Sequence, residues 1–352
     1  MRHETMTPRE RWLAVLKRST PDRLPMDYWA TPEATQALMA YLQTGTLEEM
    51  YAILHIDPLV TMGPRYVGPP LEPDMDIYGC RFRDVDYGTG VYRECIGHPL
   101  AEFNTVEQVQ DAYTWPTADW YDYSVIPSQV DGKEAYPVRG GGSEPFLVYC
   151  HLRGLEQAFM DLVLNPELVH YCLDQLFDFC YENTLRIYEA VPGRVNVSYV
   201  AEDMGSQTSL LFSPQQIHEF LIPRMKRMID LAHSSGAYVF FHSDGAVRRI
   251  IPDMIEAGID VLNPIQWRST GMGRTELARD FGDHLIFHGA VDNQQTLPFG
   301  TTADVEAEVL ENIAVLGQDG GYILAPCHNI QANTPPKNIV MMYETGYRHG
   351  WM

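Results

Sequence analysis

Short apolar runs alternate with longer amphipathic stretches from about residue 137 to the end of the chain. Each apolar run has the length of a β-strand, and each amphipathic stretch has the apolar spacing of an α-helix. Uninterrupted apolar strands are typical of parallel sheets, because helices cover both faces of such a sheet. The pattern predicts strands over residues 195–200, 237–241, 261–265, 285–288 and 321–325. The predicted helices span residues 154–164, 166–190, 213–235, 246–257, 274–281, 302–316 and 336–350.

The N-terminal third follows this pattern less regularly. Helices are predicted over residues 7–17 and 31–43, with a strand over residues 23–29 between them. Residues 58–136 are rich in proline, glycine, aspartate and aromatic residues, which predicts hairpins and loops. Repeated βα alternation over 352 residues is typical of the α/β class and of a (β/α)8 TIM barrel. We expect one domain over residues 1–352, with residues 58–136 inserted as a hairpin and loop region that covers the pocket.

The composition indicates a large core and a cytoplasmic location. Hydrophobic residues make up 45% of the chain, and no apolar run reaches the roughly 18 residues that a membrane helix needs. The N-terminus carries no apolar signal core. Six cysteines are scattered without a pairing pattern, which is typical of free thiols. The sequence is compatible with a monomer or a homodimer.

The charge excludes two classes of partner. The formal net charge is −22, whereas binding to nucleic acid needs Lys and Arg patches that neutralise phosphates. Anionic membrane surfaces would repel the chain for the same reason. We therefore expect neither a nucleic acid nor a membrane partner.

Polar side chains follow the predicted strands at their C-terminal ends, where active sites gather in parallel α/β proteins. His242 and Asp244 lie two residues apart, so in extended backbone both reach one ligand. A histidine nitrogen, a carboxylate and a thiolate suit Zn²⁺, which takes about four ligands. The predicted metal ligands are His242, Asp244, Cys327 and Glu202. His328, next to Cys327, is expected to point away from it and not to bind the metal.

Other strand-end groups suit catalysis or substrate binding. The catalytic candidates are Glu202, Asp203, Asp244 and His288, the last paired with Asp292. The substrate-binding candidates are Tyr28, Trp29, Asn263 and Gln266. Structural roles stay open at these positions: a strand-end histidine is often a hydrogen-bonded wall residue, and Asn263-Pro264 also suits a turn. The glycine run at 140–142 allows the backbone to approach a ligand closely.

Five phrases resemble the uroporphyrinogen decarboxylase superfamily, and the resemblance runs along nearly the whole chain. They are RLPMD at 23–27, FHSDG at 241–245, AGIDVL at 257–262, GAVD at 289–292 and PKNI at 336–339. The resemblance implies a (β/α)8 barrel. It also implies one of two chemistries: tetrapyrrole decarboxylation without a cofactor, or cobalamin-dependent methyl transfer assisted by zinc.

The decarboxylase branch fits less well. Decarboxylases of the superfamily carry an arginine-rich segment near the start, whereas residues 28–32 here read Tyr-Trp-Ala-Thr-Pro. A substrate with many carboxylates needs cationic clamps, and this chain has 25 Lys and Arg against 47 Asp and Glu. The sequence therefore favours the methyltransferase branch.

The resemblance to the methyltransferases is partial. Thiol-activating members show a His-X-Cys motif and a later Cys, which bind zinc; His242 and Cys327 match, but Asp244 replaces the middle Cys. Members that demethylate methoxy compounds use a Glu, Glu, His type of site, and Glu202 and Glu219 precede His242 here. Glu219 falls on a predicted helix, where a solvated face suits it better.

These observations predict a zinc-dependent methyltransferase. It would move a methyl group between a small methylated, or methoxylated, compound and a corrinoid (cobalamin) carried by a separate corrinoid protein, because this chain has no corrinoid-binding segment of its own. Two alternatives stay open. One is a metal-free decarboxylase-like carboxy-lyase in which Asp244 or Asp203 polarises the substrate. The other is a non-catalytic barrel that binds a tetrapyrrole or corrinoid.

Overall fold

The computed structural model describes residues 3–86, 88, 90–318 and 320–352. Seven parallel strands form one curled sheet in the order β1-β6-β7-β8-β9-β10-β11. The strands are β1 (Val60–Thr61), β6 (Val138–Ser143), β7 (Val197–Ala201), β8 (Tyr238–His242), β9 (Val261–Asn263), β10 (Ile286–Val291) and β11 (Tyr322–Pro326). The α/β class predicted from the sequence is therefore confirmed.

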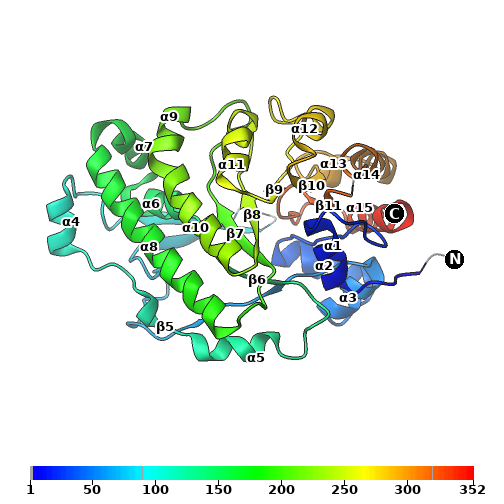
Figure 1. Cartoon of the computed structure of the whole chain (residues 1–352), viewed down its shortest axis with the longest axis horizontal. Coiled ribbons are helices and arrows are strands. Elements are labelled where there is room, and N and C mark those ends of the chain that lie inside the picture. The colour runs from blue at the N-terminus through cyan, green and yellow to red at the C-terminus, as the bar shows by residue number, and fades with distance from the viewer. Residues whose placement is uncertain (1–2, 87, 89, 319) are drawn as a thin grey trace.

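Helices surround the sheet (Figure 1). The N-terminal half contributes α1 (Pro8–Leu16), α2 (Pro32–Leu42), α3 (Leu47–Leu54), α4 (Val106–Ala112), α5 (Ile126–Val130), α6 (Pro145–Arg153), α7 (Leu155–Leu164) and α8 (Pro166–Ala190). The C-terminal half contributes α9 (Pro214–Gln216), α10 (Ile222–Ser234), α11 (Ile251–Ala257), α12 (Arg274–Phe281), α13 (Thr296–Phe299), α14 (Thr302–Leu316) and α15 (Pro336–His349). Among the described residues, no helix combines the length and apolar content that a membrane crossing requires.

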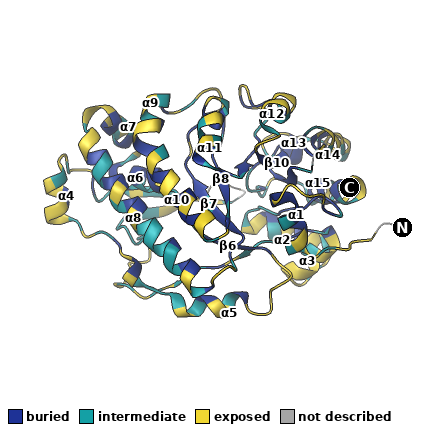
Figure 2. Ribbon diagram, viewed as in Figure 1, coloured by how far each residue is buried: buried dark blue, intermediate teal, exposed yellow. Residues whose placement is uncertain are grey.

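Alternation along the strands divides the core into two layers. Val197, Phe240, Val261, Ile286 and Ile323 form an inner cluster with Trp12 of α1, inside the curl of the sheet. The residues that follow them on the strands, such as Phe241, Leu262, Phe287 and Leu324, pack outward in the larger core. The central strands of the parallel sheet are buried, and the helices around them expose residues on their outer faces (Figure 2). The alternation of side chains along each strand therefore decides which strand-end side chains point inward.

The prediction of a strand over residues 23–29 is wrong in detail. This segment is extended but forms only isolated bridges among the described residues. Met26 and Ala30 bridge to Leu324 and Ile330 in parallel, and Arg23 bridges to Trp351 in the antiparallel sense. On its other side, the amide of Asp57 donates to the carbonyl of Met26. The segment thus lies between β11 and the chain that leads into β1, but it does not add an eighth strand to the described sheet.

The range 58–136 contains both sheet and peripheral structure. Its first residues form β1, so they belong to the parallel sheet itself. The rest includes two antiparallel pairs, β3 (Arg81–Asp86) with β4 (Val91–Gly97), and β2 (Arg65–Tyr66) with β5 (Tyr121–Asp122). That this remainder is an insertion over the pocket stays a prediction.

Candidate functional site

A cavity of about 800 Å³ lies at the C-terminal ends of the strands. That volume falls in the range typical of sites for small molecules. Aromatic side chains form much of the wall, and four titratable groups from four different strand ends face it. The wall includes Tyr28, Trp29, Tyr51, Tyr199, Arg139, Glu144, Asp203, His242 and His328. Tyr28 and Trp29 thus lie where the sequence places a substrate pocket.

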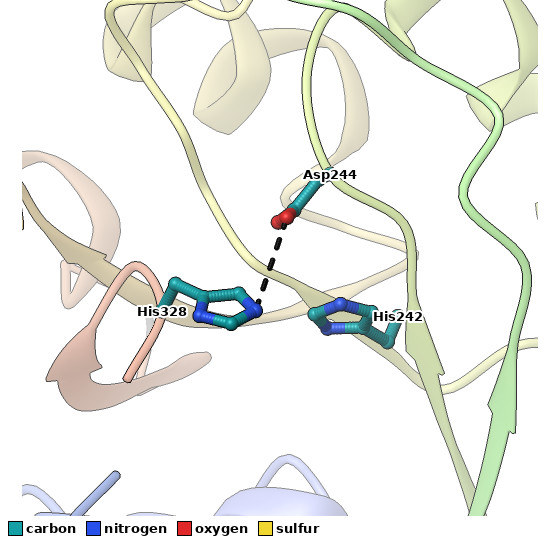
Figure 3. A group of neighbouring side chains, drawn as sticks. All are labelled: His242, Asp244 and His328. Carbon is teal, nitrogen blue, oxygen red and sulfur yellow. Dashed lines mark ion pairs between the residues drawn. The ribbon is translucent and has the colours of Figure 1, made fainter. Parts of the chain in front are cut away.

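Three side chains at this cavity could hold a metal ion. His242 ends β8, Asp244 follows in the next loop, and His328 lies just after β11 (Figure 3). One ligand atom from each lies within 4.8 Å of the others. Nε2 of His328 lies 4.0 Å from Oδ2 of Asp244. Two imidazoles and a carboxylate are a common zinc ligand set in catalytic sites, where a fourth position stays open for substrate.

A chain of buried hydrogen bonds orients His242. Its Nδ1 lies 2.5 Å from Oδ1 of Asn263, whose Nδ2 lies 2.7 Å from Nδ1 of His288. Nε2 of His288 lies 3.1 Å from Oδ2 of Asp27. Because the amide Nδ2 of Asn263 must donate, Nδ1 of His288 accepts and its Nε2–H donates to Asp27. His242 then donates through Nδ1 to the amide oxygen, which leaves the lone pair of its Nε2 for a ligand.

The ionisation of this chain agrees with those donor roles. Burial lowers the pKa of His288, so its imidazole is neutral. Burial alone would raise the pKa of Asp27, but hydrogen bonds from His288 and from the amide of Tyr28 oppose it, and that pKa is lowered. Trp29 also donates from Nε1 to Asp27, at 2.8 Å. The carboxylate of Asp27 therefore anchors the far end of the chain.

Gln266 orients the carboxylate of Asp244. Nε2 of Gln266 donates to Oδ1 of Asp244 at 3.1 Å, and its Oε1 accepts from the amide of Gly245 at 2.7 Å. This leaves Oδ2 of Asp244 facing His328. Burial raises the pKa of Asp244, and the neighbouring histidines oppose that shift. Each of His242 and Asp244 thus has one free ligand atom and one atom held by an amide side chain.

Two further carboxylates face the same histidines. Oδ1 of Asp203 lies 3.9 Å from Nε2 of His242 and accepts from the amide of Asp244 at 3.0 Å. Glu144, between β6 and α6, lines the cavity. Burial, with a contribution from the charge of Asp203, raises the pKa of Glu144 to about 6. Sequence reasoning missed Glu144, although it follows the glycine run at the end of a strand.

The glycine run bends β6 toward β7. The register between β6 and β7 shifts between Arg139 and Gly142. Gly142 has φ +137°, and a Cβ on it would lie 1.9 Å from the carbonyl oxygen of Tyr199. At Gly142 the backbone therefore lies close to the neighbouring strand β7, whereas Gly140 and Gly141 line the cavity.

Glu202 is not in this group. The alternation that points Tyr199 inward turns Val200 and Glu202 outward, toward the helices. Both carboxylate oxygens of Glu202 lie 3.1 Å from the amide of Phe146 in the first turn of α6. Burial raises the pKa of Glu202 well above its ordinary range. The structure brings Asp203, not Glu202, to the histidines.

Cys327 is also apart from the three clustered residues. Its thiol lies 3.3 Å from the carbonyl oxygen of Ile265, and burial raises its pKa well above the ordinary range. The strand ends at Pro326 and the chain bends at the next two residues, so alternation no longer holds. As a result His328, which the sequence assigned to the other side, faces the cavity.

The remaining candidates support the site from behind. Asn263 and His288 are fully buried and do not line the cavity, nor does Gln266. The expected pairing of His288 with Asp292 is wrong, because Asp292 accepts from Arg268 at 2.6 Å and from the amide of Thr296 at 3.0 Å in the first turn of α13. His288 pairs with Asp27 instead.

Comparison with known proteins identifies the family. The family described as uroporphyrinogen decarboxylase (URO-D) matches residues 121–349. The chain therefore belongs to this family, as the sequence phrases indicated, and the family is of the TIM-barrel type.

Solved structures share the fold. A methyltransferase from Methanosarcina mazei superposes with a TM-score of 0.67 at 20% sequence identity, over 97% of this chain and 99% of that chain. A Listeria monocytogenes protein assigned as a vitamin-B12-independent methionine synthase superposes with a TM-score of 0.45 at 10% identity, over 94% of this chain and 97% of that chain. No curated protein sequence matches the chain. At these identities, the first likeness establishes the fold alone.

Proposed function

We propose that this protein is a zinc-dependent methyltransferase that moves a methyl group from a small methoxylated compound to a corrinoid carried by a separate protein. The observation that carries the proposal is the group of His242, Asp244 and His328 at the edge of a small-molecule cavity. Membership of the URO-D family and the shared fold of a methyltransferase from Methanosarcina mazei support it.

The donor set suits zinc. Nε2 of His242 is free because Asn263 occupies its Nδ1, and Oδ2 of Asp244 is free because Gln266 occupies its Oδ1. Nε2 of His328 completes a set of two nitrogens and one oxygen. Catalytic zinc sites use three protein ligands of this kind and keep one position open.

The ligand set favours the methyl-donor side of the reaction. Zinc held by imidazole and carboxylate, without thiolate, keeps a strong Lewis acidity and would polarise the ether oxygen of a methyl donor. The residues of the cavity then have two tasks. Trp29 and Tyr199 would pack against the substrate and exclude water. Glu144, whose pKa is raised to about 6, would exchange a proton near neutral pH and donate it to the departing oxygen.

The test is a methyl-transfer assay linked to metal content. Purified protein should contain zinc and convert added cob(I)alamin to methylcobalamin in the presence of a methoxylated donor, which absorbance follows directly. His242→Ala and His328→Ala should lose zinc and activity together. Cys327→Ser is the matched control, because the serine hydroxyl keeps the hydrogen bond to Ile265, so zinc and activity should persist.

Three results would contradict the proposal. Metal-free protein that releases carbon dioxide from a carboxylated substrate would indicate a carboxy-lyase instead. Tight pigment binding without turnover would indicate a binding barrel. Full activity in His328→Ala would remove the proposed metal site from the reaction.

A further inference from the structure

Among the described residues that line the cavity, Arg139 on β6 is the only lysine or arginine. It is half-buried, and it makes no ion pair and no side-chain hydrogen bond with any residue that the structure describes. Its guanidinium carbon lies 5.8 Å from the ring centroid of Tyr199. A guanidinium carries five donors, so the acceptor for this one must come from outside the described protein.

The five buried arginines that the structure describes all have carboxylate partners. Asp22 and Asp57 bind Arg11, and Asp57 also binds Arg23. The remaining pairs are Arg153 with Asp161, Arg224 with Asp174, and Arg274 with Glu311. Arg139 has no such partner among the described residues, and its side chain lines the cavity.

The position of Arg139 suits contact with a ligand that also reaches the histidines. Arg139 pairs with Val197 on β7, two residues before Tyr199. The ring of Tyr199 in turn lies 5.6 Å from the ring of His242. The ring of Tyr199 therefore lies between the guanidinium of Arg139 and the imidazole of His242. A compound that contacts both groups must span this ring.

We propose that Arg139 binds a carboxylate of the substrate, so that the methyl donor is a small methoxylated carboxylic acid. This rests on the proposed function for the methyl group, while the anion subsite rests on Arg139 alone. The planar guanidinium forms two parallel hydrogen bonds to a carboxylate, and this geometry fixes the orientation of the ligand. With the carboxylate on Arg139, the other end of a short acid lies beside Tyr199 and His242.

Charge in the cavity gives Arg139 a decisive part in selectivity. Asp27, Glu144 and Asp203 line the cavity and would repel an anionic substrate, and no lysine or second arginine lines the described wall. An alternative role for Arg139 is to offset these carboxylates without touching the ligand. In that case Arg139→Lys, which keeps the charge but loses the bidentate geometry, would retain the full preference for acids, which separates the two roles by experiment.

The test compares acids with neutral analogues of the same shape. Probes are methoxyacetate with 2-methoxyacetamide and 3-methoxybenzoate with 3-methoxybenzamide, and binding to the purified full-length chain is measured by calorimetry. The acid of at least one pair should bind about 10- to 100-fold more tightly than its amide, as loss of a charge-assisted hydrogen bond implies. Arg139→Gln should abolish that preference, and Arg139→Lys should retain part of it. Arg83→Gln is the control, because Arg83 is exposed and pairs with Glu94 on β4.

An absence of acid preference in the unmodified protein would overturn the inference, and this comparison needs no variant to fold. A preference that survives Arg139→Gln would overturn it as well. Because binding is measured without turnover, acid-selective binding with no methyl transfer would contradict only the proposed function. Conversely, methyl transfer from methoxylated acids at an unchanged rate in Arg139→Gln would contradict only the anion subsite.

Discussion

At the scale of single residues, one amide side chain determines how His242 can bind a metal. Asn263 accepts from His242 through Oδ1 and donates to His288 through Nδ2. Only a side chain with one acceptor and one donor at this spacing satisfies both rings. Both hydrogen bonds are buried, so a missing partner leaves an unsatisfied group as well as a mobile ring.

Asn263→Ala should therefore weaken zinc binding by about 10- to 100-fold, as loss of a group that orients a metal ligand usually does. Competition with a chromophoric chelator would measure the affinity. Asn183→Ala is the control, because Asn183 lies on α8 and its side chain accepts from Tyr123. If Asn263→Ala binds zinc as tightly as the unmodified protein does, the buried chain does not orient His242.

At the scale of secondary structure, the strand ends explain which site residues could be predicted. Within a strand, alternation held: Phe240 faces inward, and His242 follows on the same face. The same alternation, counted from Tyr199, points Asp203 inward and Glu202 outward. It could therefore have excluded Glu202 as a predicted metal ligand. Beyond Pro326 the chain bends, and no strand rule could choose between Cys327 and His328. Side-chain bridges such as that of Asn263 depend on contacts between strands that the linear pattern does not contain.

The bend of β6 rests on Gly142. Gly142→Ala should cost about 3 kcal/mol or more, because the new Cβ would meet the carbonyl of Tyr199 and β6 would have to move. Gly193→Ala also adds a Cβ at positive φ, but into open space, and should cost only about 1 kcal/mol. Urea unfolding of the two variants would measure the difference. Equal costs would show that β6 is not pressed against β7.

At the scale of the whole molecule, a cluster of charged side chains joins the N-terminal segment to the sheet. These side chains do not line the cavity. Arg11 on α1 contacts Asp22 and Asp57, and Asp57 also contacts Arg23 and accepts from the amide of Met26. These contacts hold the extended segment around Met26 beside β11. The sequence predicted the parallel sheet from its apolar runs. It did not predict that this segment forms only isolated bridges, because tertiary ion pairs hold it there in place of a strand ladder.

Asp22 should make part of this stability depend on pH. Burial alone would raise its pKa, but hydrogen bonds from Arg11 and from two backbone amides lower the pKa to about 2. A pKa that is lower in the folded state adds stability above the unfolded value near 4, and this stability is lost as the pH falls toward 2. Asp22→Asn should therefore cost about 2 kcal/mol at pH 7 and about half as much at pH 3.

Urea unfolding at the two pH values would measure these costs. Asp119→Asn is the control, because Asp119 is exposed and pairs with Arg186 at the surface, where such pairs contribute little. A cost of Asp22→Asn that stays constant or grows as the pH falls would contradict this account.

Two imidazoles and a carboxylate, without sulfur, should hold zinc at the cavity. X-ray absorption at the zinc edge of the metal-loaded protein distinguishes this ligand set from one that contains a thiolate. We expect nitrogen and oxygen neighbours at about 2.0–2.2 Å and none at the Zn–S distance of about 2.3 Å. His328→Ala should remove one imidazole from the spectrum, and Cys327→Ser should leave it unchanged. A sulfur neighbour that disappears in Cys327→Ser would contradict the site.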